Sequence, residues 1–302
     1  MKKTKRNLLF IHNKGTLGEI CKYSLGKYFS IKSILIKKEK TTTQLKRIIE
    51  RQIKKSNIEL LVYISGETKD ERLMMKLNFE LPFQIANLCN KNSIPLVYLS
   101  SLSIYGIPKT NLITNSSQRR PINLYGISKY SFDKILGKDF PKLKFCTLIP
   151  GSIINPNSSK SNLIKKALEQ IQRKPLKWLL MIISPSGSYS CIHIDDLKIC
   201  LVKECLNIVS SNDRNLYQIF KICSTKINFY DLVTYLNGRK PLFKLKSISI
   251  KLINYFSIFF PKTFKMKLIV YFANINYESD YDFLKERNIC EYINNYTFSK
   301  NP

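Results

Sequence analysis

The chain has 302 residues, with 50 Lys and Arg against 21 Asp and Glu, so its formal net charge is +29. Hydrophobic residues make up 44% of the sequence, which excludes a chain that is disordered throughout. The length is enough to bury a large core and predicts one or two domains.

The eight cysteines and two histidines show no metal-ligand spacing. No two cysteines have the C-x-x-C spacing, and His12 lies far from His193. A chain of this length does not need disulfide staples. We therefore expect no metal site, and cysteines that are reduced and mostly buried.

The sequence also indicates neither a secretory signal nor a membrane-spanning segment. The apolar run near the N-terminus covers only residues 8–11, which is too short for a secretory signal. No stretch reaches the roughly 18 apolar residues of a membrane span. These observations predict a cytoplasmic protein.

The large positive charge is compatible with a polyanionic partner, either nucleic acid or an anionic membrane surface. The basic residues are spread along the whole chain, however, and abundant Lys, Asn and Ile are typical of a low-GC coding sequence. No nucleic-acid-binding motif is present. We expect no specific nucleic-acid partner and a weak attraction to anionic membrane surfaces.

Strand-like and helix-like segments alternate through the first half of the chain. Strands are predicted at residues 7–11, 31–36, 59–64, 95–99 and 144–148. Helices are predicted at residues 18–28, 43–55, 73–90 (kinked at Pro82) and 125–136. Because most of the strands are nearly unbroken apolar runs, this order predicts an α/β fold with a Rossmann-like, doubly wound parallel sheet.

The second half is less regular and predicts a smaller C-terminal α/β lobe. Helices are predicted at residues 161–173, 195–209 and 229–236, with Asp195 as an N-cap, and a strand at 189–194. Trp178, with Leu179, Leu180 and Met181, is expected to pack inside the lobe. Residues 248–260 are apolar with nearby Lys, which fits a lobe helix or a membrane-interface segment. The domains expected are 1–155 plus about 186–225, and about 156–185 plus 226–302.

A candidate phosphate-binding turn follows the first strand. Gly15 and Gly18 have the spacing of the second and third glycines of a G-x-x-G-x-x-G motif, which lets the backbone approach a pyrophosphate at a helix N-terminus. His12 stands at the first glycine position, where a side chain is expected to crowd the turn. After the second strand, Lys37 and Lys38 replace the usual acid and would suit a 2′-phosphate.

The most specific pattern is S-S-x-x-x-Y-G after the fourth strand, followed by P-x-N-x-Y-G-x-S-K. Tyr125 and Lys129 lie four residues apart and so share a helix face. A nearby ammonium group is expected to lower the pKa of a tyrosine, which can then exchange a proton with a hydroxyl while hydride moves to a nicotinamide. A strand-end serine can orient the same oxygen.

These motifs resemble those of the extended short-chain dehydrogenases/reductases, in the NAD-dependent epimerase/dehydratase family that acts on nucleotide sugars. Other segments match in the right order along nearly the whole chain: Y-I-S-G at 63–66, Asn78, I-P-G at 149–151 and I-H-I-D-D-L at 192–197.

The resemblance implies a role for each matching residue. Tyr125 would be the catalytic acid/base, Lys129 would hold the nicotinamide ribose, and Ser101 would hydrogen-bond the reacting oxygen. The residues implied to contact an NAD or NADP cofactor are Gly15, Gly18, Lys37, Ser65, Gly66, Ser100, Tyr125, Lys129 and Pro150. Gly151 would contact the substrate with Ser101 and Tyr125.

Several positions depart from the family pattern. His12 replaces a glycine, Ile149 stands where Arg is usual, and the segment before Ile192 lacks the Arg that often binds the substrate's diphosphate. The sequence therefore predicts an NAD(P)-dependent nucleotide-sugar epimerase or keto-reductase. The alternative is a catalytically degenerate homologue that binds a dinucleotide or nucleotide sugar without turnover. Leu102 and Ser103 supply no second acid/base beside Ser101, which argues against a dehydratase.

The partners implied are a nucleotide-diphosphate sugar and a second copy of the chain. Relatives often pair through the two long helices that flank the active site, which here correspond to residues 73–90 and 125–136. A homodimer is therefore expected.

Overall fold

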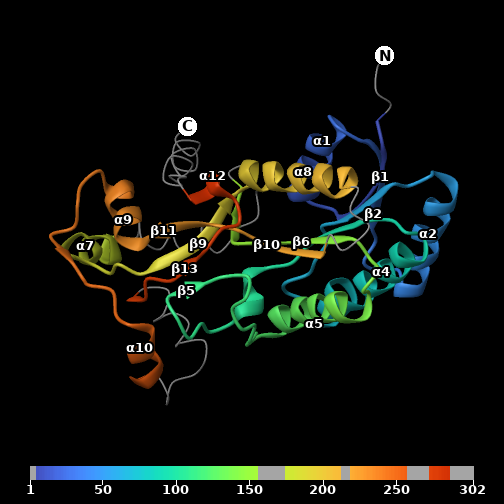
Figure 1. Ribbon diagram of the computed structural model, residues 1–302. Helices are drawn as coiled ribbons and strands as arrows, with labels where there is room; N and C mark the ends of the chain where they lie inside the picture. The colour runs from blue at the N-terminus through green and yellow to red at the C-terminus, as the bar shows by residue number, and fades with distance from the viewer. Residues whose placement is uncertain (1–4, 156–173, 212–217, 257–271, 286–302) are drawn as a thin grey trace. The chain divides into compact units, whose positions relative to one another are not determined.

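The computed structural model describes residues 5–155, 174–211, 218–256 and 272–285 (Figure 1). The chain forms two compact units, each built from several segments. The first contains Met1–Gly106, Pro121–Ile149 and Leu197–Lys221, and the second contains Ile107–Arg120, Pro150–Asp196 and Ile222–Pro302. The predicted helix at 161–173 lies outside the described residues.

The first unit is organised around a six-stranded sheet with the strand order β10-β6-β4-β3-β1-β2. The ladders that join β2, β1, β3, β4 and β6 are parallel. The chain leaves β1 on one side to form β2 and returns on the other side to form β3, which creates a switch point between β1 and β3. This confirms the predicted Rossmann-like, doubly wound sheet. Its strands are β1 Asn7–Asn13, β2 Ser30–Ile36, β3 Leu60–Tyr63, β4 Leu96–Leu99, β6 Phe145–Pro150 and β10 Gln218–Cys223.

Helices cover both faces of this sheet. Figure 1 shows α1 and α8 on one side and α2, α4 and α5 on the other. On the second side, one apolar cluster joins Ile49 of α2, Ile85 of α4 and Phe132 of α5 to the strands. The helices are α1 Thr16–Gly26, α2 Thr42–Lys55, α3 Glu71–Met75, α4 Leu81–Lys91, α5 Leu124–Asp139 and α8 Ile194–Ser210, with a 3₁₀ turn at Leu102–Tyr105.

The helix α2 illustrates how the local sequence specifies these elements. Thr41 and Gln44 form a reciprocal capping box at its N-terminus. Leu45, Ile49 and Ile53 recur at four-residue intervals and are all buried, so a single stripe of the helix faces the sheet.

The long helix predicted at residues 73–90 is interrupted, but not where the sequence suggested. A π-helical turn at Lys76–Glu80 separates α3 from α4, and Pro82 lies in the first turn of α4. A proline there gives up a backbone N–H that has no partner within its own helix, so it starts α4 rather than kinking it.

The second unit contains small sheets and a separate core. Strand β9 pairs with β7 in parallel and with β11 in antiparallel fashion. The parallel pairs β8–β12 and β5–β13 complete its strands. Its core includes Ile154, Cys191 and Val233. The elements are β5 Leu112–Ile113, β7 Ser152–Ile154, α7 Lys174–Ile182, β8 Ile183–Ser184, β9 Ser188–His193, β11 Thr225–Asn228, α9 Phe229–Asn237, β12 Phe243–Lys244, α10 Ile250–Phe256, β13 Asn276–Tyr277 and α12 Asp282–Lys285.

Two details of the second unit correct the sequence predictions. Leu180 and Met181 do pack in its core, but Trp178 and Leu179 are exposed because they lie on the opposite side of α7. Helix α8 begins at Ile194, so Asp195 lies in the first turn rather than at the N-cap.

The cysteines agree with expectation over the described part of the chain, where seven are free and buried. Among the described helices, none has the length and apolar character needed to cross a bilayer.

Candidate active site

The turn between β1 and α1 has an open backbone. Gly15 is the N-cap of α1 and no side chain caps this helix end. A Cβ atom added at Gly15 would meet nothing within 4 Å. The first amide groups of α1 have no intrahelical acceptors, so this open helix end suits an anionic group such as a pyrophosphate.

His12 is the next-to-last residue of β1, and its ring does not come within 4 Å of a Cβ built at Gly15. The ring is buried, with Nδ1 donating to the Asn13 carbonyl at 3.0 Å and Nε2 at 3.1 Å from the Ser33 hydroxyl. A Cβ atom at Gly18 would lie 2.3 Å from His12 Nδ1. The expected crowding therefore falls on Gly18, whose missing side chain makes room for the histidine, and the turn at Gly15 stays open.

The carboxyl ends of β1 and β3 are tied together at the switch point. Asn13 Nδ2 donates to the Gly66 carbonyl at 2.7 Å, and the Ser65 hydroxyl donates to Asn13 Oδ1. Asn78, in the π-helical turn, bonds both backbone groups of Glu67 and also donates to Ser128 on α5 at 3.0 Å. The Ser65–Gly66 loop is thus fixed from two sides.

The basic residues after β2 differ in their surroundings. Lys38 forms an ion pair with Glu67, whereas Lys37 is exposed. Burial favours a higher pKa for Glu67, but hydrogen bonds from Lys38 and from the amides of Lys69 and Thr68 outweigh it and lower the pKa to about 2. Lys38 is therefore held at the loop after β3, although it is itself exposed, and Lys37 is a second exposed basic residue at this edge.

Helix α5 brings the predicted catalytic residues to the ends of β3 and β4. Asn123 caps the helix by accepting from the Gly126 amide at 2.8 Å. Tyr125, in the first turn, lies close enough to the Ser101 side chain for that group to act on its pKa. Lys129, one turn later, is buried and donates to the Leu99 carbonyl at 2.8 Å. The expected meeting of Ser101, Tyr125 and Lys129 follows from this arrangement.

Lys129 is also close to the loop after β3. Its Nζ lies 3.5 Å from the Ser65 carbonyl, and a Cβ atom added at Gly66 would come within 3.3 Å of it. The same nitrogen lies 4.7 Å from the centre of the Tyr98 ring. Burial lowers the pKa of Lys129 to about 7, and the nearby Asp133 carboxylate opposes that shift.

Asp133 is a member of this cluster that the sequence analysis did not single out. It is buried on α5, and its Oδ2 accepts from the Ser100 hydroxyl at 2.7 Å. Its sequence signal was available, because it follows Lys129 by four residues and so lies on the same helix face.

The pKa of Tyr125 differs from the sequence expectation. Burial raises it above its ordinary value, and the nearby Ser101 side chain opposes that shift. Lys129 directs its ammonium group at a backbone carbonyl and an aromatic ring. The lowering of the Tyr125 pKa that the spacing to Lys129 predicts is therefore not found in the structure.

Two of the predicted contact residues belong to the second unit. Pro150 is the last residue of β6, and Gly151 follows it. A Cβ atom at Gly151 would lie 2.8 Å from the Cys191 amide nitrogen, and the Gly151 amide donates to the Cys223 carbonyl at 3.1 Å. Close backbone packing accounts for this glycine, and a substrate contact there remains a prediction.

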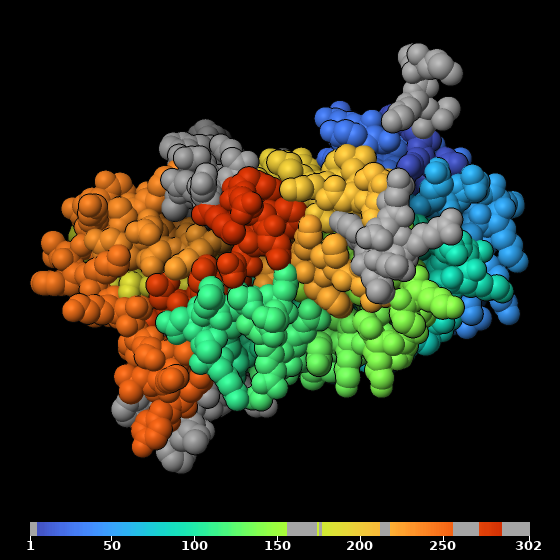
Figure 2. Space-filling model, viewed as in Figure 1, coloured from blue at the N-terminus to red at the C-terminus, as the bar shows by residue number. Residues whose placement is uncertain are grey.

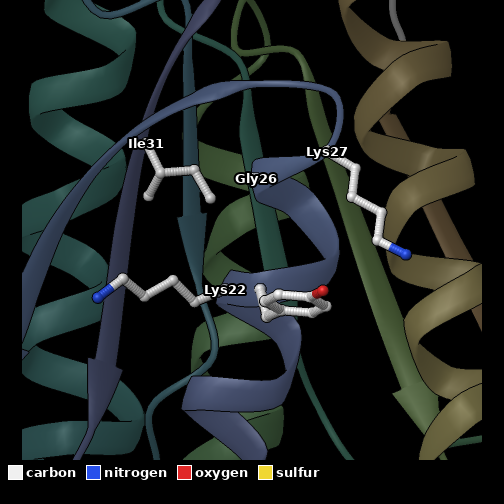
Figure 3. Close-up of a pocket in the computed structure, with 5 residues that line it drawn as sticks. Lys22, Gly26, Lys27 and Ile31 are labelled. Atoms are coloured by element: carbon white, nitrogen blue, oxygen red, sulfur yellow. The ribbon is translucent and has the colours of Figure 1, made fainter.

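A hollow of about 390 Å³ lies elsewhere on the first unit, between the end of α1 and the start of β2 (Figure 3). It is lined by Lys22, Tyr23, Gly26, Lys27 and Ile31. Figure 3 shows the amino groups of Lys22 and Lys27 pointing in opposite directions, so they do not converge on one ligand. The hollow is near the amino end of β2, whereas the cluster around Tyr125 lies at the carboxyl ends of the strands.

Comparison with solved structures identifies the same fold. A dTDP-4-dehydrorhamnose reductase from Yersinia enterocolitica has a TM-score of 0.63 at 16% identity, covering 97% of this chain and 100% of its own. The enzyme WbmG from Bordetella bronchiseptica, solved in complex with NAD, has a TM-score of 0.59 at 15% identity, covering 82% of this chain and 84% of its own.

Sequence comparison gives the family. ADP-L-glycero-D-manno-heptose-6-epimerase from Brachyspira hyodysenteriae is 29% identical over 135 residues, and this alignment spans 42% of each chain. The model of the NAD dependent epimerase/dehydratase family matches residues 48–219, which is more than half of the chain and includes Ser101, Tyr125 and Lys129. The chain therefore belongs to the NAD dependent epimerase/dehydratase family.

Proposed function

We propose that the protein is an NAD(P)-dependent enzyme that reduces or epimerises the sugar of a nucleotide-diphosphate sugar. The observation that carries this proposal is the convergence of Ser101, Tyr125 and Lys129 at the ends of β3 and β4. The first unit would hold the cofactor, and the second unit would supply contacts to the substrate.

The residues of the first unit fit a dinucleotide. The open, uncapped end of α1 at Gly15 suits the pyrophosphate, and Lys129, which packs closely against Gly66, would bind the ribose. Lys37 is exposed after β2 and would contact a 2′-phosphate, which favours NADP. When bound, a nicotinamide supplies or accepts the hydride.

The chain's own residues would then handle the proton. Ser101 would hold the sugar oxygen, and Tyr125 would exchange a proton with it. Burial raises the pKa of Tyr125 and the nearby Ser101 side chain opposes that rise, so Ser101 would also help Tyr125 to exchange the proton. Reduction of a keto-sugar and epimerisation both need this exchange.

The test is a calorimetric titration with NAD, NADH, NADP and NADPH. We expect micromolar binding with a preference for the 2′-phosphorylated pair. Gly15→Ala should weaken binding about tenfold, because its methyl group enters the open space at the helix end. Gly26→Ala is the matched control at the other end of α1, where a Cβ would only touch Ile31 at 3.7 Å, and it should bind like the wild type.

Turnover is then measured with ADP-, UDP-, GDP- and dTDP-linked sugars and keto-sugars. Tyr125→Phe should keep cofactor binding and lose more than 99% of the activity. If none of the four dinucleotides binds, the enzyme proposal fails. If a dinucleotide binds but no sugar is converted, the chain is the degenerate binding homologue.

A further inference from the structure

The second unit carries a set of large apolar side chains on its surface. We call this set, with the basic residues around it, the α7–β12 face. Its apolar members are Trp178, Leu179, Ile182, Ile183, Leu242 and Phe243, whose exposed fractions range from 38% at Ile183 to 75% at Leu242. Single exposed apolar residues are ordinary on proteins, but a contiguous group marks an interaction surface.

Backbone pairing brings the two segments of this set side by side. Helix α7 leads directly into β8, which pairs in parallel with β12 so that Phe243 is the register partner of Ile183. The Leu242 amide donates to the Met181 carbonyl at 2.9 Å. In Figure 1, α7 lies beside the orange chain between α9 and α10 that carries β12.

The fold holds this face outward. Leu180 and Met181 anchor one side of α7 in the core of the second unit. Trp178, Leu179 and Ile182 lie on the other side and are exposed. The apolar surface is therefore a fixed feature of a packed helix. Figure 2 shows the orange residues that include β12 at the surface of the unit.

The charge around these side chains has one sign. Residues 174–187 and 232–256 contain no Asp or Glu. The basic residues Lys174, Lys177, Arg239, Lys240, Lys244 and Lys246 are all exposed. A partner that covers this face must accept apolar side chains and must also be negatively charged.

We propose that the α7–β12 face binds the surface of an anionic lipid membrane. Tryptophan, phenylalanine and leucine beside lysine and arginine are the composition of interfacial membrane-binding surfaces. The apolar side chains would enter the boundary between headgroups and acyl chains while the basic side chains contact lipid phosphates. A second copy of the chain is a poor partner because it presents the same positive charge. Nucleic acid provides no apolar environment in which the aliphatic side chains could be buried.

Membrane binding by this face does not depend on the proposed enzymatic activity. The fluorescence of Trp178 can measure it. Because this is the only tryptophan in the chain, its fluorescence reports on the α7–β12 face alone. The experiment adds phosphatidylcholine vesicles with or without 30% phosphatidylglycerol. We expect co-sedimentation at least ten times stronger with the anionic vesicles, with a blue shift of the emission and protection from iodide quenching.

Matched variants separate this face from the general positive charge. Leu242→Glu should weaken binding to anionic vesicles at least tenfold. Tyr23→Glu, in the first unit, introduces the same charge at a side chain that is also 75% exposed, and it should change binding less than twofold. Lys177→Gln with Lys246→Gln should weaken binding and reduce its dependence on salt.

Three results would overturn the proposal. The first is no binding to either vesicle. The second is binding that Leu242→Glu and Tyr23→Glu weaken equally, without a change in Trp178 emission, since net charge alone would then explain it. The third is self-association that Leu242→Glu abolishes while vesicles fail to bind, which would identify a second copy as the partner.

Discussion

Gly15 and Gly18 belong to one turn but meet different physical constraints. The space beside Gly15 is open, whereas the space beside Gly18 is filled by the His12 ring. His12 bonds Asn13 and Ser33, so the ring has little freedom to move aside. The departure from the family's first glycine is thus accommodated at Gly18, in the first turn of α1, and the space beside Gly15 stays open.

This arrangement predicts a coupling between His12 and Gly18. Gly18→Ala should lower the free energy of unfolding by about 1–3 kcal/mol, as expected for an overpacked core. In a His12→Ala background the same change should cost less than half as much, with the Asn13 carbonyl at 3.1 Å accounting for the remainder. Urea unfolding of the four proteins measures both values. An equal cost in the two backgrounds would contradict the contact.

Lys129 predicts a pH dependence of stability. Its pKa is lowered from 10.5 to about 7 in the folded protein, mainly by burial. Between these values the unfolded chain binds the extra proton, so the free energy of unfolding should rise with pH. The contribution from Lys129 is about 1 kcal/mol between pH 7.5 and 8.5.

The measurement compares the wild type with Lys129→Met by urea unfolding at both pH values without added cofactor. The wild type should gain about 1 kcal/mol more than the variant over this interval. The window ends below pH 9 because buried thiols act in the opposite direction above it; burial raises the pKa of Cys21 to about 12. Identical slopes for the two proteins would rule out a titrating Lys129.

At the scale of elements, the sequence predicted the helices and strands that are specified by neighbouring residues in the chain. Helix α2 has a capping box and an apolar stripe, and helix α5 follows a polar cap and places Tyr125 and Lys129 one turn apart. The meeting of these residues with Ser101 was predictable because a strand end precedes them and a parallel sheet collects such ends at one edge.

Elements that depend on distant partners were missed. Strand β10 is mostly half-buried and lies at the edge of the sheet, so its sequence lacks a continuous apolar run. The π-helical turn places Asn78 against Glu67 and Ser128, which are contacts between separate parts of the chain. The pKa shifts at Tyr125 and Lys129 depend on burial, which spacing along a helix does not reveal.

At the scale of the whole molecule, the chain enters the first unit more than once. After residue 149 it builds part of the second unit and then returns with residues 197–221, which form most of α8 and β10. Buried Glu204 on α8 accepts from Lys221 on β10 at 3.0 Å and from Cys146 on β6. The returning segment therefore supplies a helix on one face and a strand at one edge of the large sheet.

A fragment ending at residue 155 should therefore not fold stably. It would keep β1 to β7 but lose Leu197, Cys200, Leu201, Cys205 and Ile208, which are all buried. Burial of each such side chain stabilises a folded protein by about 1.5–3 kcal/mol. Because the free energy of unfolding is typically about 5–15 kcal/mol, losing several of them should unfold the fragment. Urea unfolding followed by circular dichroism should show a cooperative transition for the full chain and none for the fragment.

Joining residues 194–223 to the fragment through a flexible linker should restore a cooperative transition. A fragment that unfolds cooperatively near the midpoint of the full chain would mean that the returning segment is dispensable, and that the first unit folds before α8 and β10 are added.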